Sequence, residues 1–198
     1  MPDEGPVYGA NSLDLFVDRL SRFREPVILD LGQVSELNLN FLAGENGFAV
    51  RVEDLSREMD GDLPGAVDEM ALDKGRFHGV LIWSLLDHLQ EDVFRSLVIK
   101  LWSALQPGGL VVAFFGQRER PEVPIQRFII RGRGMISVLE TLVKAPCRNW
   151  PNREILKLFE PFETVNSFIL KSGLREFLFR RPPSMTWDIE SSEEAGLG

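Results

Sequence analysis

Short apolar segments separated by amphipathic stretches are the feature that most constrains the fold of this chain. Residues 27–31, 79–83 and 110–115 are almost entirely apolar, without alternation, which is typical of strands buried on both faces. Residues 91–105 carry apolar side chains at three- and four-residue steps, which predicts a helix between the last two strands. Strands and helices in this order predict an α/β fold, a mostly parallel sheet with helices on both faces.

The segments nearer the start of the chain fit the same plan. Residues 11–25 predict a helix that ends before Pro26, with Asn11 as a plausible N-cap. Residues 48–52 predict a second strand. A weaker apolar pattern over residues 67–72 predicts a third strand, which would extend the sheet on that side.

The character of the sequence changes after Gly116. Residues 117–134 hold five arginines and two prolines and are expected to be irregular or partly helical, and residues 135–143 are expected to form a helix. Residues 164–170 and 175–180 resemble strands joined by a short connection, which predicts a C-terminal antiparallel β-hairpin.

The length of 198 residues fits one domain with a full-sized core. We expect a flexible N-terminus over residues 1–10, a single domain over 11–181 and an acidic, disordered tail over 182–198. No run of eighteen apolar residues and no signal-peptide pattern occurs, so a cytoplasmic protein without membrane spans is expected. One cysteine and two histidines exclude a Cys- or His-rich metal site, and no metal is expected.

Charge is distributed unevenly along the chain. The net charge is −8, with −10 over residues 1–116, +6 over 117–181 and −4 over 184–198. The acidic total argues against a nucleic-acid partner. The basic section favours a neutral or anionic small-molecule acceptor, or pairing with acidic surfaces of the same chain or of a homo- or hetero-oligomeric partner.

Three motifs carry a family resemblance. The first is Val27-Ile28-Leu29-Asp30-Leu31-Gly32, a strand followed by an acidic residue and a glycine. The second is the Glu53-Asp54 pair that follows the strand over residues 48–52, and the third combines residues 77–89 with Leu-Gln-Pro-Gly-Gly at 105–109. Together they resemble the class I S-adenosylmethionine-dependent methyltransferase superfamily over residues 11–181. The resemblance implies a Rossmann-like, mostly parallel seven-stranded sheet.

The resemblance also implies an activity and a site. The cofactor would be S-adenosylmethionine, and the reaction would be methyl transfer to a small acceptor. Asp54 would accept hydrogen bonds from the ribose, since a carboxylate at a strand end can hold a diol, although capping the turn at Leu55 is an alternative role. The remaining candidates for cofactor binding are Asp30, Gly32, Asp68 on the adenine side and Trp83, for which a core position is the alternative.

The loop after the first strand departs from the family pattern. Val34 and Glu36 stand where the second and third glycines are expected. Val34 resists positive φ, and Glu36 would bring a negative charge near the methionine carboxylate. These departures favour an alternative, a methyltransferase-like pseudoenzyme acting as a binding or regulatory subunit. A nicotinamide-dependent oxidoreductase is disfavoured because Val34 and Leu37 replace glycines that its fingerprint requires.

Candidates for catalysis and acceptor binding follow the later strands. Asp87 and His88 come just after the strand over residues 79–83, where a general base would lie, although a polar pair leading into a helix is the simpler interpretation. Arg118, Arg120 and Arg127 are candidates for the substrate side, with a solvated loop as the alternative.

Overall fold

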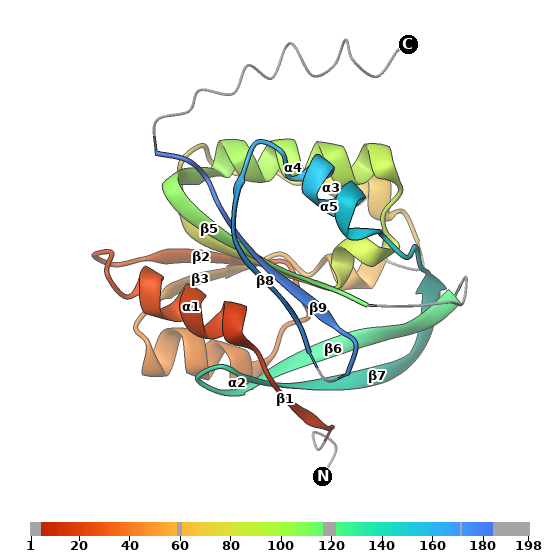
Figure 1. Cartoon of the computed structure of the whole chain (residues 1–198), viewed down its shortest axis with the longest axis horizontal. Coiled ribbons are helices and arrows are strands. Elements are labelled where there is room, and N and C mark those ends of the chain that lie inside the picture. Colours follow the sequence, from red (N-terminus) through yellow and green to blue (C-terminus); the bar gives the residue numbers. More distant parts are fainter. Residues whose placement is uncertain (1–4, 59–60, 117–121, 171, 184–198) are drawn as a thin grey trace.

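We describe a computed structural model of the chain, which covers residues 5–58, 61–116, 122–170 and 172–183. Its main sheet has six strands, and the four that come first in the chain run parallel (Figure 1). From one edge to the other, the strands are β3 (Ala49–Val52), β2 (Val27–Asp30), β4 (Phe77–Trp83), β5 (Leu105–Phe115), β9 (Arg175–Arg180) and β8 (Glu163–Ile169). The expected C-terminal hairpin is confirmed, because β9 pairs antiparallel with both β5 and β8.

The prediction of seven strands in this sheet is wrong for the part of the chain that the structure describes. The missing member is the strand expected over residues 67–72. Residues 67–69 instead end helix α3 (Leu63–Glu69), and residues 70–72 belong to no helix or strand. Asp62 caps the first turn of α3 by accepting a hydrogen bond from the Gly65 N–H at 2.9 Å. Because β2 and β3 complete that side, β3 is an edge strand.

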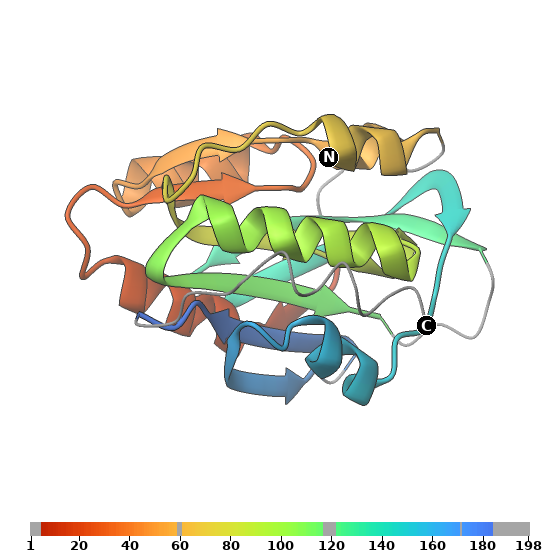
Figure 2. The ribbon, with the colours of Figure 1, turned by 90° about the horizontal axis from the view of Figure 1, so that it is seen from above.

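Two hydrophobic clusters cover the two faces of the main sheet. The helices that contribute to them lie over both faces (Figure 2). Alternate residues along each strand enter different clusters: Val111, Ala113 and Phe115 face one, whereas Val112 and Phe114 face the other. The first cluster is covered by α3, α4 (Glu91–Ala104) and α5 (Asn152–Leu158). The second includes α1 (Asn11–Leu20) and η1 (Asn40–Glu45), a wide helical turn that continues α2 (Glu36–Leu39). Helices therefore lie on both faces, as the sequence predicts.

A second sheet of three antiparallel strands packs beside the main one. Its order is β1 (Val7–Gly9), β7 (Met135–Pro146) and β6 (Glu122–Gly132). The prediction of a helix over residues 135–143 is therefore wrong. The prediction of irregular or partly helical structure is also wrong for residues 122–132, which form β6. Gly132 and Gly134 both have positive φ and form the β6–β7 turn. Within the N-terminal segment, Val7–Gly9 pair with β7.

The first helix is anchored by a buried carboxylate from the other end of the chain. Ala10, rather than the expected Asn11, holds the N-cap position and makes no side-chain cap. Glu176 of β9 accepts hydrogen bonds from the Asn11 and Ser12 N–H groups at 2.9 and 3.1 Å. Burial raises the pKa of Glu176 to about 7, against the lowering effect of these two bonds. The sequence motif predicts the helix but not this distant cap.

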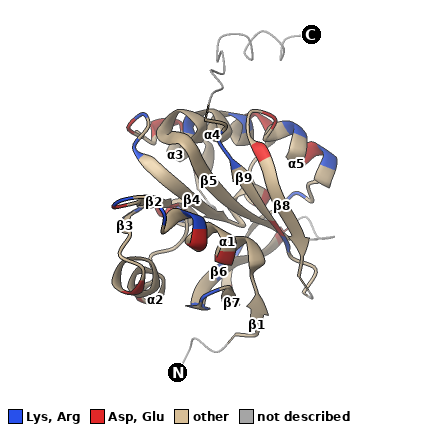
Figure 3. Cartoon of the chain, turned by 60° about the vertical axis from the view of Figure 1, so that its left-hand side comes forward, with Lys and Arg blue, Asp and Glu red and all other residues tan. Residues whose placement is uncertain are grey.

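Two short 3₁₀ turns complete the described elements: η2 (Leu55–Glu58) after β3, and η3 (Leu85–His88) after β4. Charged residues lie mainly on helices and connections, while the strands of the main sheet have few of them (Figure 3). No helix in the described ranges is both long and apolar enough to cross a membrane.

Candidate functional site

The carboxyl ends of β3, β2 and β4 bring together three of the residues singled out from the sequence. Asp54 follows β3, Gly32 follows β2 and Trp83 is the last residue of β4. The strand that follows β2 in the chain, β3, lies beside β2 on one side, and the next strand, β4, lies beside β2 on the other. The strand order therefore reverses at β2, which makes the carboxyl ends of these strands a topological switch point. Ligands of open α/β sheets bind in the crevice at such points.

Asp30 organises the centre of this edge. Its Oδ1 accepts hydrogen bonds from the Gly32 N–H at 2.9 Å and from the Trp83 indole N–H at 2.7 Å. Burial raises the pKa of the Asp30 carboxyl to about 6, since removal from water disfavours the charged form. The two hydrogen bonds act in the opposite direction, and the nearby negative charge of Asp54 adds to the rise. Asp30 is thus a buried anchor that ties the loop after β2 to the end of β4.

The Trp83 indole packs directly on the backbone of Gly32. A Cβ atom added to Gly32 would lie 2.4 Å from Trp83 Cδ1, so only glycine is compatible with this contact. On its own side of the sheet the indole stacks with Phe114 and Phe128, at centroid distances of 5.7 and 5.3 Å. Trp83 is 4% exposed. Trp83 is therefore both a member of the core and a wall of the site.

Asp54 is held in place by its own loop. Its Oδ1 accepts hydrogen bonds from the Ser56 N–H at 3.2 Å and from the Ser56 hydroxyl, and its Oδ2 lies 3.1 Å from Arg57 Nε. The local capping role is thus present. A carboxylate offers about four acceptor positions, so these bonds leave capacity on Oδ2 for a ligand. The side chain remains partly exposed at the surface of the site.

A wide groove borders Asp54. We call it the Asp54 groove; its volume is about 540 Å³, and it lies between the loops after β2 and β3 and the ends of the β6–β7 hairpin. Its lining residues are Gln33, Val34, Asp54, Ser56, Arg57, Ile125, Arg127, Thr141 and Val143. This volume is in the range of small-molecule sites.

A narrow pocket adjoins the Asp54 groove on the side of β4. This pocket, the Trp83 neck, shares Gln33, Ser56 and Arg127 with the groove and holds only about 20 Å³ of space. Its other walls include Gly32, Leu31, Ile82, Trp83, Ser84, Leu85, Gln126 and Phe128. The neck is therefore closed to anything larger than about one water molecule.

A second sizeable cavity shares one lining residue with the neck. The Tyr8 cavity has a volume of about 460 Å³ and shares Gln126 with the neck. It lies between the three-stranded sheet, the end of β5 and the β8–β9 connection, and is lined by Gly5, Pro6, Tyr8, Gly116, Gln126, Val138, Leu139, Glu140, Ser172 and Leu174. Groove, neck and cavity thus follow one another along the carboxyl edge of the main sheet.

The comparisons with known proteins bear on the fold. No family model and no curated protein matches the sequence. Solved structures do match. One is the 1,6-didemethyltoxoflavin-N1-methyltransferase of Burkholderia thailandensis with bound S-adenosylhomocysteine, at 16% identity and a TM-score of 0.56, covering 87% of this chain and 77% of that one.

Two further structures give the same result. The glycopeptide N-methyltransferase MtfA with S-adenosylhomocysteine has 18% identity and a TM-score of 0.54, covering 88% of this chain and 87% of its own. An S-adenosylmethionine-dependent methyltransferase from Clostridium acetobutylicum has 10% identity and a TM-score of 0.52, covering 87% and 92%. This chain has the class I methyltransferase fold. The resemblance seen in the sequence motifs is confirmed at the level of fold.

Within this methyltransferase fold, the other predicted site residues lie away from the groove and neck. Asp68 is on the exposed side of α3, where its carbonyl accepts a hydrogen bond from Lys100 Nζ at 2.8 Å. Asp87 is buried, and its Oδ2 accepts a hydrogen bond from the Gly116 N–H at 2.7 Å. His88 Nδ1 lies 2.7 Å from the Pro146 carbonyl oxygen, which requires the proton on Nδ1. Asp87 and His88 thus connect η3 to the ends of β5 and β7.

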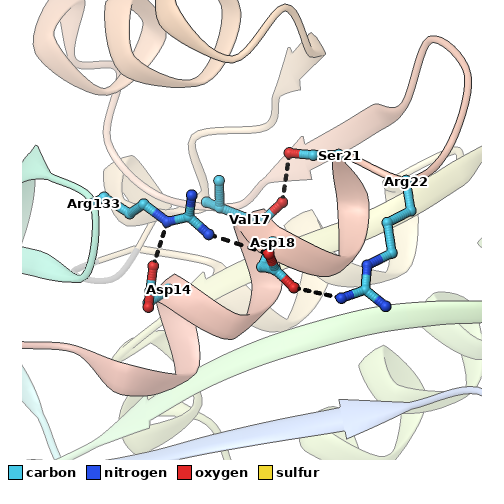
Figure 4. A network of polar contacts seen from close by, with 6 residues as sticks. All are labelled: Asp14, Val17, Asp18, Ser21, Arg22 and Arg133. Carbon is cyan, nitrogen blue, oxygen red and sulfur yellow. Dashed lines mark hydrogen bonds and ion pairs between the residues drawn. The ribbon is translucent and has the colours of Figure 1, made fainter.

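The arginines of the basic section are divided between the site and the scaffold. Arg127 lines both the Asp54 groove and the Trp83 neck. Arg118 and Arg120 lie outside the described residues. Arg133 lies 2.6 Å from Asp14 and 3.3 Å from Asp18, so it ties the β6–β7 turn to α1 (Figure 4). Position in the basic section alone therefore does not identify a ligand contact.

The two glycine replacements in the loop after β2 point outward. Val34 is 49% exposed and lines the Asp54 groove, and Glu36 is exposed in the first turn of α2. Neither fills the neck, which is closed by Trp83 instead.

Sequence reasoning missed the residues supplied by the three-stranded sheet. Gln126, Tyr8 and Glu140 line the neck or the Tyr8 cavity, and each comes from β1, β6 or β7. A signal was present: Gly132-Arg133-Gly134 separates two runs rich in β-branched residues, which is typical of a β-hairpin.

Proposed function

We propose that this chain is an S-adenosylmethionine-dependent methyltransferase that acts on a small-molecule acceptor. The observation that carries the proposal is the Asp54 carboxylate beside a groove of about 540 Å³, at the switch point of a class I methyltransferase fold. S-adenosylmethionine, when bound, supplies a methyl group activated by a sulfonium centre. Positioning accounts for most of the catalysis in such a transfer, so the chain needs no strong acid or base at this edge.

The residues present fit the nucleoside half of that cofactor. Asp54 would accept hydrogen bonds from the ribose hydroxyls, and Val34 and Ile125 offer apolar surface to a base within the same groove. The amino-acid half does not fit this conformation, because the Trp83 indole occupies the space against Gly32. Asp68, Asp87 and His88 have no part in the proposed binding mode.

The Tyr8 cavity is the proposed acceptor site. It meets the neck at Gln126, so a molecule held there would face the donor side through one shared wall. Tyr8, Gln126, Glu140 and Ser172 offer polar groups, while Val138, Leu139 and Leu174 are apolar. These walls suit a partly apolar small molecule with hydrogen-bonding groups. Among the described lining residues there is no Lys or Arg, so the cavity itself does not favour an anionic acceptor.

The proposal is tested by calorimetric titration of the purified chain with S-adenosylhomocysteine. We expect binding that weakens by about tenfold or more in Asp54→Ala, because the ribose loses its acceptor. Asp62→Ala is the matched control, since Asp62 also caps a turn but lies on α3 outside the groove. Absence of binding at millimolar ligand, or equal binding by both variants, contradicts the proposal.

A second candidate is the methyltransferase-like binding protein without activity. The closed Trp83 neck favours it, since a donor that cannot reach Gly32 cannot present its methyl group to the Tyr8 cavity. The two candidates differ in one measurement. An active enzyme releases S-adenosylhomocysteine when supplied with S-adenosylmethionine and a panel of small acceptors, whereas the binding protein releases none.

A further inference from the structure

Trp83 has an unfavourable backbone conformation. Its φ is +56°, and Glu25 is the one other non-glycine residue with positive φ in the described ranges. Glu25 lies in the exposed turn before β2, whereas Trp83 ends the central strand β4. Holding a bulky residue in this region costs about 1–3 kcal/mol, and such strain clusters at sites where it serves a function. The surrounding contacts must therefore hold Trp83 in place.

Those contacts come from a hydrogen bond and from an aromatic cluster. The ring N–H donates to Asp30 Oδ1, and the indole stacks with Phe114 and Phe128, which also contact each other. The same Asp30 oxygen receives the Gly32 N–H, so one buried acceptor fixes the indole and the loop beneath it together. If the indole left, Asp30 would still hold Gly32, and the face of Gly32 that it covers would become accessible.

The position of the indole decides which ligands fit. A ribose bound by Asp54 would lie at the end of β3, and a ribose substituent that follows the sheet edge toward Gly32 would extend across β2 toward β4. That direction leads from the Asp54 groove into the Trp83 neck, where about 20 Å³ is available. A nucleoside ends before the neck. The amino-acid chain of S-adenosylmethionine or S-adenosylhomocysteine would have to enter it.

We propose that Trp83 is a gate in the donor site: closed against Asp30 and Gly32, it admits an adenine nucleoside and excludes the amino-acid part of S-adenosylmethionine. The gate must leave Gly32 before the whole cofactor binds. This inference rests on the proposed function and deepens it. The apparent affinity for the whole cofactor is the intrinsic affinity reduced by the fraction of molecules with an open gate, whereas nucleoside affinity is independent of that fraction.

The test compares adenosine with S-adenosylhomocysteine by calorimetry on the full chain. In the wild type we expect dissociation constants within about threefold of each other, because the amino-acid part adds no net affinity. In Trp83→Phe and Trp83→Ala we expect S-adenosylhomocysteine to bind about tenfold or more tightly than adenosine, because the neck is widened. Trp102→Phe is the matched control: Trp102 is equally buried, at 3% exposure, but lies in α4 on the other side of the sheet.

A second measurement covers the case in which Trp83→Ala fails to fold. Acrylamide quenching of tryptophan fluorescence should increase when S-adenosylhomocysteine, but not adenosine, is added to the wild type, because gate opening exposes the indole. Trp83→Phe should abolish that increase and Trp102→Phe should keep it. S-adenosylhomocysteine binding the wild type tenfold better than adenosine, with no change in Trp83→Phe, overturns the gate but leaves the proposed function intact. Failure of both ligands to bind wild type and variants overturns both proposals.

Discussion

The Asp54 groove and the Trp83 neck lie on the same edge of the same sheet, yet one is open and the other is closed. In both, a carboxylate accepts hydrogen bonds from a nearby N–H group and from side chains. At Asp54 the side-chain partners are the Ser56 hydroxyl and the solvated Arg57, whereas at Asp30 the partner is the buried Trp83 indole. The fold therefore determines where a ligand site lies, while the side chains bonded to each carboxylate determine whether that carboxylate is accessible to a ligand.

The largest expected effect comes from adding a methyl group to the closed region. In Gly32→Ala the new Cβ would meet Trp83 Cδ1 at 2.4 Å and Nε1 at 2.6 Å. Overpacking of this kind costs about 1–3 kcal/mol, to be measured by denaturant unfolding. Gly9→Ala is the control, because its Cβ meets nothing within 4 Å. Equal stability of the two variants would show that the indole yields easily and that the neck is not tightly packed.

The corresponding change in the open region should affect binding more than stability. Asp54→Ala removes an acceptor from Ser56 and from Arg57, a local cap worth about 1 kcal/mol. We expect adenosine affinity to fall about tenfold, in a titration at constant pH and salt. An unchanged affinity with lowered stability would reduce Asp54 to a structural cap and would remove the contrast with Asp30.

The two carboxylates should also differ in pH dependence. Asp30 has a pKa of about 6 when folded, above its ordinary value of 3.8, so ionisation costs more in the folded than in the unfolded chain. Its contribution to stability is therefore largest below pH 3.8 and is lost as the pH rises to about 6. Asp30→Asn keeps the Oδ1 acceptor and removes this loss.

We expect the free energy of unfolding of Asp30→Asn to rise relative to that of the wild type as the pH increases, by on the order of 2 kcal/mol between about pH 4 and about pH 7. Unfolding curves collected between pH 4 and about pH 7 measure it. Glu176, whose pKa is raised to about 7, is present in both proteins and cancels in the difference. A flat difference would contradict the burial cause given for Asp30.

The smallest effect should come from the basic section outside both regions. Arg133 pairs with Asp14 and Asp18 at the surface of α1, and all three side chains are substantially exposed. Arg133→Ala should leave adenosine affinity unchanged, in contrast to Arg127→Ala, whose side chain lines both groove and neck. A loss of affinity in Arg133→Ala would extend the ligand site beyond the cavities described above.

The parallel half of the fold was predictable and the three-stranded sheet was not. Segments such as residues 79–83 are apolar throughout, and a doubly buried strand is the simplest structure for them. Residues 135–143 are not apolar throughout, and Leu142 among them is 102% exposed, so their own periodicity is unclear. The local signal is the Gly132-Arg133-Gly134 turn, which indicates a hairpin but not its pairing with β1. The pairing of β7 with β1 is set by contacts across most of the chain, which no local pattern records.

The same limit applied to the site. The family resemblance of the strand-end motifs implied Asp30, Gly32, Asp54 and Trp83 as site residues, and the structure brings all four to one edge. The sequence did not reveal that the Trp83 indole packs on Gly32. That contact depends on the positive φ of Trp83 and on its hydrogen bond to Asp30, 53 positions away in the chain. Asp68 was a candidate only because it lay in an expected strand, whereas the structure places it in helix α3.

The place of β9 in the main sheet has a consequence for synthesis of the chain. β5 is apolar from Leu110 to Phe115, and its outer hydrogen-bonding edge is covered by β9, which leaves the ribosome only after β6, β7, α5 and β8. Until then the nascent chain carries an open, strongly apolar strand edge, which is a template for association between chains. Ribosomes stalled before residue 175 should therefore yield products that depend on chaperones and enter inclusion bodies, whereas release after β9 should not.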